Sequence, residues 1–262
     1  KATTLGMDFA GVVEATGDDV TAFSPGDRVF GLSPDRYGAH AEHLVVPEDG
    51  PVAAMPDGLA FREAVICEGA WYADTYLKVF GLGAGQSILI YGASGAIGTA
   101  AVQLAKYYGA EVTAVAETRH MDLVKSLGAD HAVDYTAQDF TRIGRTFDFV
   151  LDAVGKTSYF ECRPLLNSDG RFSATDLGPW WQNIWLPLWF SATGSRRVSF
   201  PMPKADKAMV EFFADRLEAG DLRAVIDSVH PFGAIVEAYR YVETARKTGI
   251  VVIEGMTGAK DA

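Results

Sequence analysis

Three glycines, Gly92, Gly95 and Gly98, are the residues of this chain whose types and spacing best fit a chemical task. They lie in SILIYGASGAIGTAAVQLAK (87–106), after the β-forming run Ile88–Tyr91 and before a run of small helix-forming residues. Glycines let a strand turn tightly into a helix, and the N–H groups of the new helix then face an anion. The pattern predicts a pyrophosphate-binding turn, although an ordinary turn between strand and helix can share this spacing.

A second strand that ends in an acid favours the binding interpretation. Residues Ala110–Glu117 (AEVTAVAE) have β character, and Glu117 stands 19 positions after Gly98. In dinucleotide-binding folds a carboxylate at about this distance bonds the ribose hydroxyls. We therefore expect a dinucleotide cofactor.

The elements around this turn predict an α/β chain in three sections. Residues 1–57 contain short strands and turns, 58–221 alternate strands and helices as in a doubly wound parallel sheet, and 222–262 return to the first section. The helix expected between the first two sections covers Ala60–Val79. The other expected elements are the strands Phe9–Glu14, Arg28–Gly31, Ala39–Val46, Ala132–Tyr135, Phe147–Ala153, Arg171–Ala174, Arg196–Phe200, Ala224–Val229 and Gly249–Ile253, and the helices Met121–Leu127, Lys204–Ala219 and Phe232–Ala245.

Composition narrows the class of protein. The 262 residues are 48% hydrophobic, which is enough for full-sized cores, and the net charge of −11 disfavours nucleic acid and anionic membranes as partners. Cys67 and Cys162 lack metal-ligand or disulfide spacing. No apolar run is long enough to span a bilayer, and the first residues lack an export signal. We expect a soluble, cytoplasmic protein with a small-molecule partner and without membrane insertion.

Several motifs together resemble the medium-chain dehydrogenase/reductases, in particular their zinc-independent quinone oxidoreductase-like branch. Besides the glycine turn they are LGMDFAGV (5–12), GDRVF (26–30), GAHAE (38–42), LGADHAVDY (127–135), DFVLDAVG (148–155) and KTGIVVI (247–253). The resemblance implies a Rossmann cofactor domain inserted in a GroES-like β-barrel domain. It also implies hydride transfer from NAD(P)H. Members of the family usually carry a further stretch before the first motif, which leads us to expect a partial barrel here.

The resemblance also bears on metal. Zinc members have Gly-His-Glu where this chain has Gly6-Met7-Asp8, and the methionine thioether is a poor zinc ligand beside imidazole or thiolate. Cys67 or Glu68 lies near where another ligand would fall, but one ligand cannot make a tetrahedral site. We expect no metal, and we expect Asp8 to hold a backbone turn or a neighbouring side chain.

Carried onto this sequence, the family pattern gives a set of cofactor contacts. Arg119, two positions after Glu117, favours the 2′-phosphate of NADPH, as does Tyr135, whereas Glu117 favours NADH. We expect NADP, with NAD as the alternative. The full set of expected cofactor-binding residues is Gly92, Ser94, Gly95, Ala96, Ile97, Gly98, Glu117, Arg119, Tyr135, Ala153 and Val154.

Two residues are candidate proton donors to a substrate oxygen. His40 lies in the GAHAE motif, which borders the cleft in the family, and histidine titrates near neutral pH. Tyr37, three residues earlier, is the competing donor. We name both as candidate catalytic residues.

A tryptophan-rich run, PWWQNIWLPLWF (179–190), follows the fifth expected strand of the Rossmann sheet. Core packing, a substrate lip or partner surface, and membrane-surface contact are three interpretations that the sequence leaves open.

Without a metal, an enzyme of this kind must stabilise charge on its acceptor by hydrogen bonds, which favours electrophilic acceptors. We therefore expect an NAD(P)H-dependent oxidoreductase acting on a quinone or an α,β-unsaturated carbonyl compound. A non-catalytic sensor or structural subunit that binds NAD(P)H is the alternative. Relatives pair through edge strands of the sheet, so we also expect a homodimer, with Arg196–Phe200 at its interface.

Overall fold

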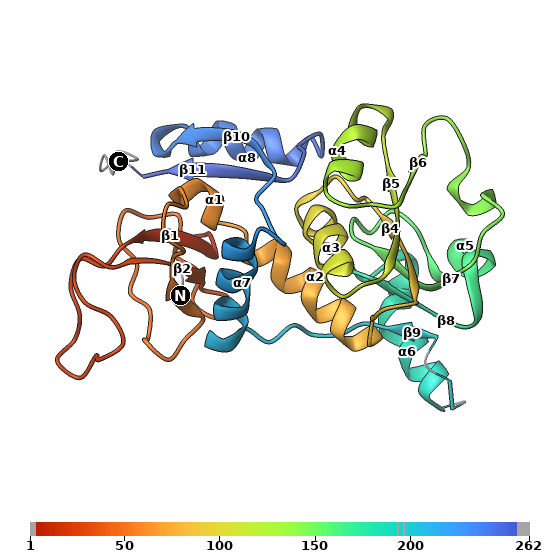
Figure 1. The fold of residues 1–262 in the computed structure, drawn as a ribbon, viewed down its shortest axis with the longest axis horizontal. Coiled ribbons are helices and arrows are strands. Elements are labelled where there is room, and N and C mark those ends of the chain that lie inside the picture. Colours follow the sequence, from red (N-terminus) through yellow and green to blue (C-terminus); the bar gives the residue numbers. More distant parts are fainter. Residues whose placement is uncertain (1–3, 193, 196, 256–262) are drawn as a thin grey trace. The chain divides into compact units, whose positions relative to one another are not determined.

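The computed structural model describes residues 4–192, 194–195 and 197–255, which form two compact units. The first unit contains residues 1–71 and 204–262, and the second contains residues 72–203. Helix α2 (Cys67–Phe80) begins in the first unit and ends in the second. Figure 1 shows the chain leaving the first unit through α2 and returning to it through α7 (Lys207–Ala219).

The second unit is built on a six-stranded, entirely parallel sheet in the order β6-β5-β4-β7-β8-β9 (Figure 1). This order, with the first strand of the unit in the middle, is that of a Rossmann fold and confirms the expected fold class. The strands are β4 (Ser87–Tyr91), β5 (Glu111–Ala116), β6 (His131–Asp134), β7 (Phe147–Asp152), β8 (Leu166–Ala174) and β9 (Val198–Ser199), and the helices are α3 (Ala96–Tyr107), α4 (Met121–Ser126), α5 (Tyr159–Cys162) and α6 (Gln182–Ala192).

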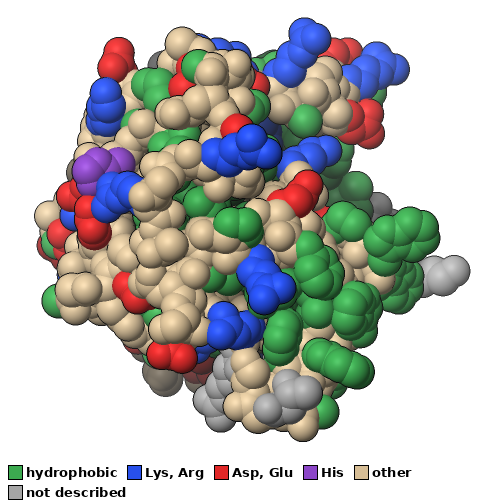
Figure 2. All heavy atoms as spheres, turned by 90° about the vertical axis from the view of Figure 1, so that its right-hand side faces the viewer, with side chains coloured by type: hydrophobic (Ala, Val, Ile, Leu, Met, Phe, Trp, Pro, Cys, Tyr) green, Lys and Arg blue, Asp and Glu red, His purple; other side chains and the backbone are tan. Residues whose placement is uncertain are grey.

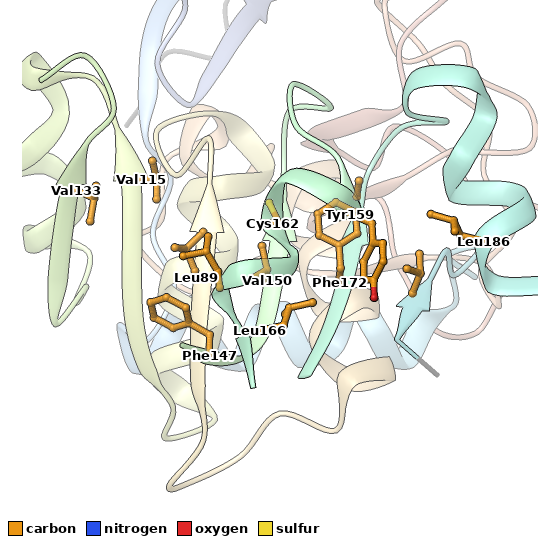
Figure 3. Packing of buried hydrophobic residues seen from close by; sticks show 13 residues of the cluster. Leu89, Val115, Val133, Phe147, Val150, Tyr159, Cys162, Leu166, Phe172 and Leu186 are labelled. Carbon is orange, nitrogen blue, oxygen red and sulfur yellow. The ribbon is translucent and has the colours of Figure 1, made fainter. Parts of the chain in front are cut away.

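The core of this unit is formed by the near-continuous apolar runs of the central strands, as a sheet covered on both faces requires. Ile88, Leu89 and Ile90 of β4 are completely buried. Figure 3 shows side chains of the parallel strands meeting those of α5 and α6, among them Phe147, Tyr159 and Phe172. This core fixes the carboxyl ends of the strands, where the expected cofactor residues stand.

The first unit combines an antiparallel sheet and a parallel pair. The sheet has the order β1-β2-β3, and β10 pairs with β11 in parallel. Helix α7 packs on β3 and β2. The bounds are β1 (Asp8–Val12), β2 (Arg28–Leu32), β3 (Val52–Ala54), α1 (Phe61–Ala64), β10 (Ile226–Pro231), α8 (Ile235–Glu243) and β11 (Ile250–Glu254).

Three expected elements differ in the structure. The strand expected at 39–46 is not formed within the described residues, where the backbone N–H groups of Ala39 and His40 donate to the carbonyls of Gly6 and Leu5 but no regular strand pairing follows. The helix expected at 60–79 is divided into α1 and α2 around Val65, whose ψ of 58° is not helical. The strand expected at 196–200 is reduced to β9, and Arg196 lies outside the described residues.

The unit boundaries also lie elsewhere than the expected 57/58 and 221/222. The structure divides the chain at 71/72 and 203/204. Because α7 buries Met209, Val210 and Phe213 and packs on β2 and β3, it groups with the first unit rather than with the Rossmann sheet. No helix in the described ranges is long and apolar enough to cross a bilayer.

Candidate functional site

The turn between β4 and α3 is shaped by glycines that have no room for a side chain. A Cβ on Gly98 would lie 2.7 Å from the Cα of Ala93, and one on Gly92 would collide with the side chain of Val154. Gly92 also has a φ of +77°, which side chains disfavour. A Cβ on Gly95 would meet only the carbonyl oxygen of Gly92, at 3.6 Å. Two of the three glycines are therefore required by packing, and the third is compatible with alanine inside the fold.

The N-terminus of α3 fits the phosphates of a dinucleotide. Gly95 is the N-cap residue and supplies no capping side chain, so the backbone N–H groups of the first turn, which include those of Ala96 and Ile97, receive no hydrogen bond from an N-cap side chain. The helix dipole adds partial positive charge at this end. The expected contact residue Ser94 precedes the cap in the same turn. These features form a backbone cradle at the carboxyl end of β4, where the sequence predicts a pyrophosphate.

Three side chains at the ends of the neighbouring strands form a connected group. The Nε of Arg119 lies 3.0 Å from Oε2 of Glu117, and the hydroxyl of Tyr135 donates to Oε1 of Glu117 at 2.9 Å. The hydrogen bond from Tyr135, followed by that from Arg119, lowers the pKa of Glu117, while burial and this hydrogen bond raise the pKa of Tyr135 to about 12. At neutral pH Glu117 is therefore a carboxylate held between two donors. The fold brings together these three residues, which were expected to contact the adenosine end of the cofactor.

The loop after β7, which carries Ala153 and Val154, is ordered by an acid that the sequence reasoning did not single out. Asp152 is fully buried and accepts the backbone N–H groups of Val154, Gly155 and Thr157 at 2.8–2.9 Å. Burial raises the pKa of Asp152, and the three hydrogen bonds oppose that shift. An acid at the end of an apolar strand, followed by small residues, is the signal that could have identified it.

A second group of ionisable side chains lies in the first unit. Nδ1 of His40 lies 3.0 Å from the hydroxyl of Tyr239 in α8, and the two rings meet edge to face with centroids 5.6 Å apart. The imidazole also packs on Gly6, where a Cβ would lie 2.5 Å from Cδ2 of His40. Burial lowers the pKa of His40. The structure thus fixes His40, and Tyr239 is a partner that sequence reasoning missed.

Asp8 makes the backbone contact that was expected of it. Its Oδ1 accepts the N–H of Glu68 in the first turn of α2 at 2.8 Å. Burial raises the pKa values of Asp8 and Glu68. Burial lowers the pKa of Lys247, and the negative charge of Glu68 is the main effect that opposes this shift. Among the described residues no group of three or more His, Cys, Asp or Glu side chains is arranged to hold a metal ion.

Tyr37, the second candidate proton donor, lies in the turn that precedes the GAHAE motif. The φ of Tyr37 is +54°, its backbone N–H donates to the carbonyl of Ser33, and the Ser33 hydroxyl donates to the carbonyl of Tyr37. The backbone of Tyr37 therefore shapes the turn before the GAHAE motif, and its side chain is 43% exposed.

The parallel sheet and the glycine cradle define a dinucleotide-binding protein of the Rossmann class. Comparison with known proteins gives the family. The family described as "Alcohol dehydrogenase GroES-like domain" matches residues 2–57, and the family described as "Zinc-binding dehydrogenase" matches residues 127–253. The chain belongs to the medium-chain dehydrogenase/reductase superfamily, in its quinone oxidoreductase-like branch, whose members are NAD(P)H-dependent oxidoreductases.

Similar proteins include reductases and quinone oxidoreductases. The 2-methylene-furan-3-one reductase of Solanum lycopersicum is 34% identical over 96% of this chain, which spans 63% of that protein's length. The chloroplastic quinone-oxidoreductase homolog of Spinacia oleracea is 32% identical over 96% of this chain and 80% of its own. The solved quinone oxidoreductase of Coxiella burnetii superposes with a TM-score of 0.84 and 25% identity, covering 95% of this chain and 78% of its own.

Proposed function

We propose that this protein transfers hydride from NADPH to a quinone or an α,β-unsaturated carbonyl compound. The observation that carries the proposal is the glycine cradle at the carboxyl end of β4, with Arg119, Glu117 and Tyr135 at the ends of β5 and β6. The names of its relatives, a furanone reductase and quinone oxidoreductases among them, support the acceptor class. The nicotinamide cofactor would supply the hydride.

The chain's own residues would then bind and orient the cofactor and protonate the acceptor. The N–H groups of α3 would hold the pyrophosphate, Arg119 the 2′-phosphate, and Ala153 and Val154 the side of the cofactor facing β7. When an enone or quinone carbon accepts hydride, an electron pair moves onto the acceptor oxygen, which needs a hydrogen-bond donor and then a proton. We assign the donation of this proton to His40. We also propose that the reaction needs no zinc, because Met7 stands where zinc members have a ligand.

Steady-state assays test the reaction class. NADPH is expected to be oxidised in the presence of a quinone and of an α,β-unsaturated ketone, but not with a simple saturated ketone, which lacks the activated carbon. Zinc chelation should leave the rate unchanged. Tight NADPH binding without oxidation by either acceptor would contradict the proposal and favour a cofactor-binding sensor or structural subunit.

Substitution of His40 tests the proton donor. Because burial lowers the pKa of His40 below its usual 6.5, the imidazolium is the minor form at pH 7, and its contribution should grow as the pH falls. His40→Gln is expected to lower kcat by about 10²- to 10⁴-fold and to abolish this rise. The cofactor dissociation constant should not change, since the residues assigned to the cofactor lie in the other unit.

Tyr37→Phe and His43→Gln are the matched controls. Tyr37→Phe removes the competing hydroxyl and leaves the backbone of the turn in place, while His43 is an exposed histidine paired with Glu14. Both variants are expected to keep the wild-type rate and pH profile. A loss of rate in Tyr37→Phe with normal rates in His40→Gln would transfer the role to Tyr37.

We further infer that two copies of the chain pair through β9. This strand ends the sheet order, and it bonds only β8 within the described residues. Pro201 and Pro203 follow it and cannot extend a ladder. Light scattering at tens of micromolar is expected to give twice the mass of one chain. The cellular compartment stays a prediction, because the relatives include proteins named as chloroplastic and mitochondrial.

A further inference from the structure

Helix α6 and the turn before it expose an unusual set of large apolar side chains. We name these residues the tryptophan surface: Trp180, Trp181, Ile184, Trp185, Leu188 and Trp189. Their exposed fractions run from 40% at Ile184 to 92% at Trp180. Figure 2 shows hydrophobic side chains gathered along one side of the face that it presents. Core packing, one of the interpretations of this run, is therefore wrong for these six residues.

The segment that carries the surface is firmly held. Leu186 is buried in the core of the Rossmann unit, and the ring of Phe190 packs edge to face on Tyr159 with centroids 5.3 Å apart. The backbone N–H of Asn183 donates to the carbonyl of Leu177, and the indole N–H of Trp185 donates to the carbonyl of Trp180. The exposed indoles thus belong to an ordered helix anchored by its other face.

The backbone conformation at the start of the surface is costly. Trp180 and Trp181 have φ values of +56° and +57°, in the left-handed region that bulky side chains avoid. Such residues persist where the surrounding structure holds them, and they concentrate at functional positions. Here the strained turn holds Trp180 at 92% exposure, although tryptophan side chains are on average highly buried in folded proteins.

Charge and area both favour a second copy of this chain as the occupant. Residues 177–192 contain no Asp, Glu, Lys or Arg, whereas the chain carries a net charge of −11. Two copies repel each other over most of their surface, so an uncharged surface is where they can meet at the lowest electrostatic cost. Aromatic side chains bury about 150–250 Å² each. The exposed parts of the tryptophan surface therefore offer on the order of 800 Å², about the contribution of each partner to a stable interface.

The surface is also continuous with the open edge of the sheet, because α6 contacts β9. We propose that the tryptophan surface is the apolar core of a two-fold interface in which each copy covers the same surface of its partner. The inference rests on the pairing of two copies through β9 proposed above, and it adds the side chains that would hold the pair together. A two-fold interface uses one patch on both subunits, which an uncharged aromatic surface satisfies.

The experiment uses analytical ultracentrifugation of the full chain at micromolar to tens of micromolar concentration. The double variant Trp180→Ser/Leu188→Ser removes the two most exposed members of the surface and leaves the buried Leu186 and the partly buried Phe190 in place. We expect a dimeric wild type and a rise of at least about thirtyfold in the dimer dissociation constant of the variant, since buried interface tryptophans carry much of the binding energy. The control Val45→Ser/Val236→Ser changes two exposed apolar residues of the first unit and should stay dimeric.

A second measurement follows the indoles. Four of the chain's five tryptophans lie in the surface, so acrylamide quenching of tryptophan fluorescence should weaken as the wild type is concentrated from monomer to dimer. The double variant should show no such change over the same range. An unchanged NADPH dissociation constant in the variant shows that the Rossmann unit is intact.

Three outcomes would overturn the inference. A variant as dimeric as wild type would leave pairing through β9 standing and remove the tryptophan surface from the interface. A wild type that stays monomeric would refute both. A monomeric wild type that floats with phosphatidylcholine vesicles, while the variant does not, would assign the surface to lipid instead. None of these results bears on NADPH oxidation, which the acceptor assays measure separately.

Discussion

Gly98→Ala is expected to abolish measurable cofactor binding and to lower the melting temperature, although alanine normally strengthens a helix. The added Cβ would lie 2.7 Å from the Cα of Ala93 and would also collide with the carbonyl oxygen of Gly92. Both neighbours are backbone atoms and cannot rotate away. Overpacking of this kind costs about 1–3 kcal/mol, against a gain in helix propensity of about 1 kcal/mol. The turn must therefore shift, and the cradle that it forms shifts with it.

Gly95→Ala is the informative comparison. Its φ of −80° suits alanine, and its Cβ would make only an ordinary contact of 3.6 Å with the carbonyl oxygen of Gly92. This variant should melt like the wild type and still bind NADPH more weakly, because the second glycine of the turn lets the backbone approach the pyrophosphate. Gly11→Ala, in β1 with no atom within 4 Å of the added Cβ, should change neither property.

Calorimetry and titration of cofactor fluorescence measure the two effects. For a chain of this size, the resulting net loss of up to about 2 kcal/mol lowers the melting temperature by up to roughly 8 °C. Gly98→Ala with wild-type melting and affinity would show that the turn has room that the structure does not give it. Normal affinity in Gly95→Ala would place the pyrophosphate elsewhere.

Arg119→Ala is expected to weaken NADPH binding by roughly 10- to 150-fold and to leave NADH binding nearly unchanged. A charge-assisted contact with the 2′-phosphate contributes about 1.5–3 kcal/mol. In the structure Arg119 pairs with Glu117, but the two side chains are 55% and 41% exposed. An exposed ion pair contributes about 0–1 kcal/mol, so a phosphate can displace the carboxylate from the guanidinium.

Glu117→Ser should move the preference further toward NADPH. The hydrogen bonds from Tyr135 and Arg119 lower the pKa of Glu117, so it keeps its negative charge at neutral pH and repels the 2′-phosphate. Serine removes that charge. It also removes the carboxylate that would bond both ribose hydroxyls of NADH. Dissociation constants for NADPH and NADH, measured in the wild type and in each variant, give the preference for one cofactor over the other directly.

Arg142→Ala is the matched control for the arginine. It removes an exposed guanidinium that pairs with Asp139 after β6, and it should change neither affinity. An Arg119→Ala protein that retains full NADPH affinity would end the NADP assignment. If Glu117→Ser also lost NADH affinity, the cofactor would be NAD.

The sequence by itself determined the Rossmann unit and the residues at its strand ends. Apolar runs such as Ile88–Tyr91 can be buried only in a sheet covered on both faces, and their order along the chain gives the parallel topology. The glycine turn follows from the same local rules, because Gly92 has a φ of +77° and a Cβ on Gly98 would collide with the backbone of Gly92 and Ala93 in the same turn. Local pattern was sufficient where the constraint itself was local.

Tertiary structure decided what depends on partners distant in sequence. The bond between His40 and Tyr239 joins residues 199 positions apart, and no periodicity connects them. Residues 39–46 alternate like a strand, but a strand needs a ladder of hydrogen bonds, and among the described residues this segment has two such bonds, to Leu5 and Gly6. The sequence likewise did not determine whether the tryptophans are exposed. An apolar helix has the same sequence pattern whether its apolar side chains are buried in a core or lie at the surface. Only the tertiary structure shows that α6 packs on the core through Leu186 and Phe190 and that its tryptophans are exposed.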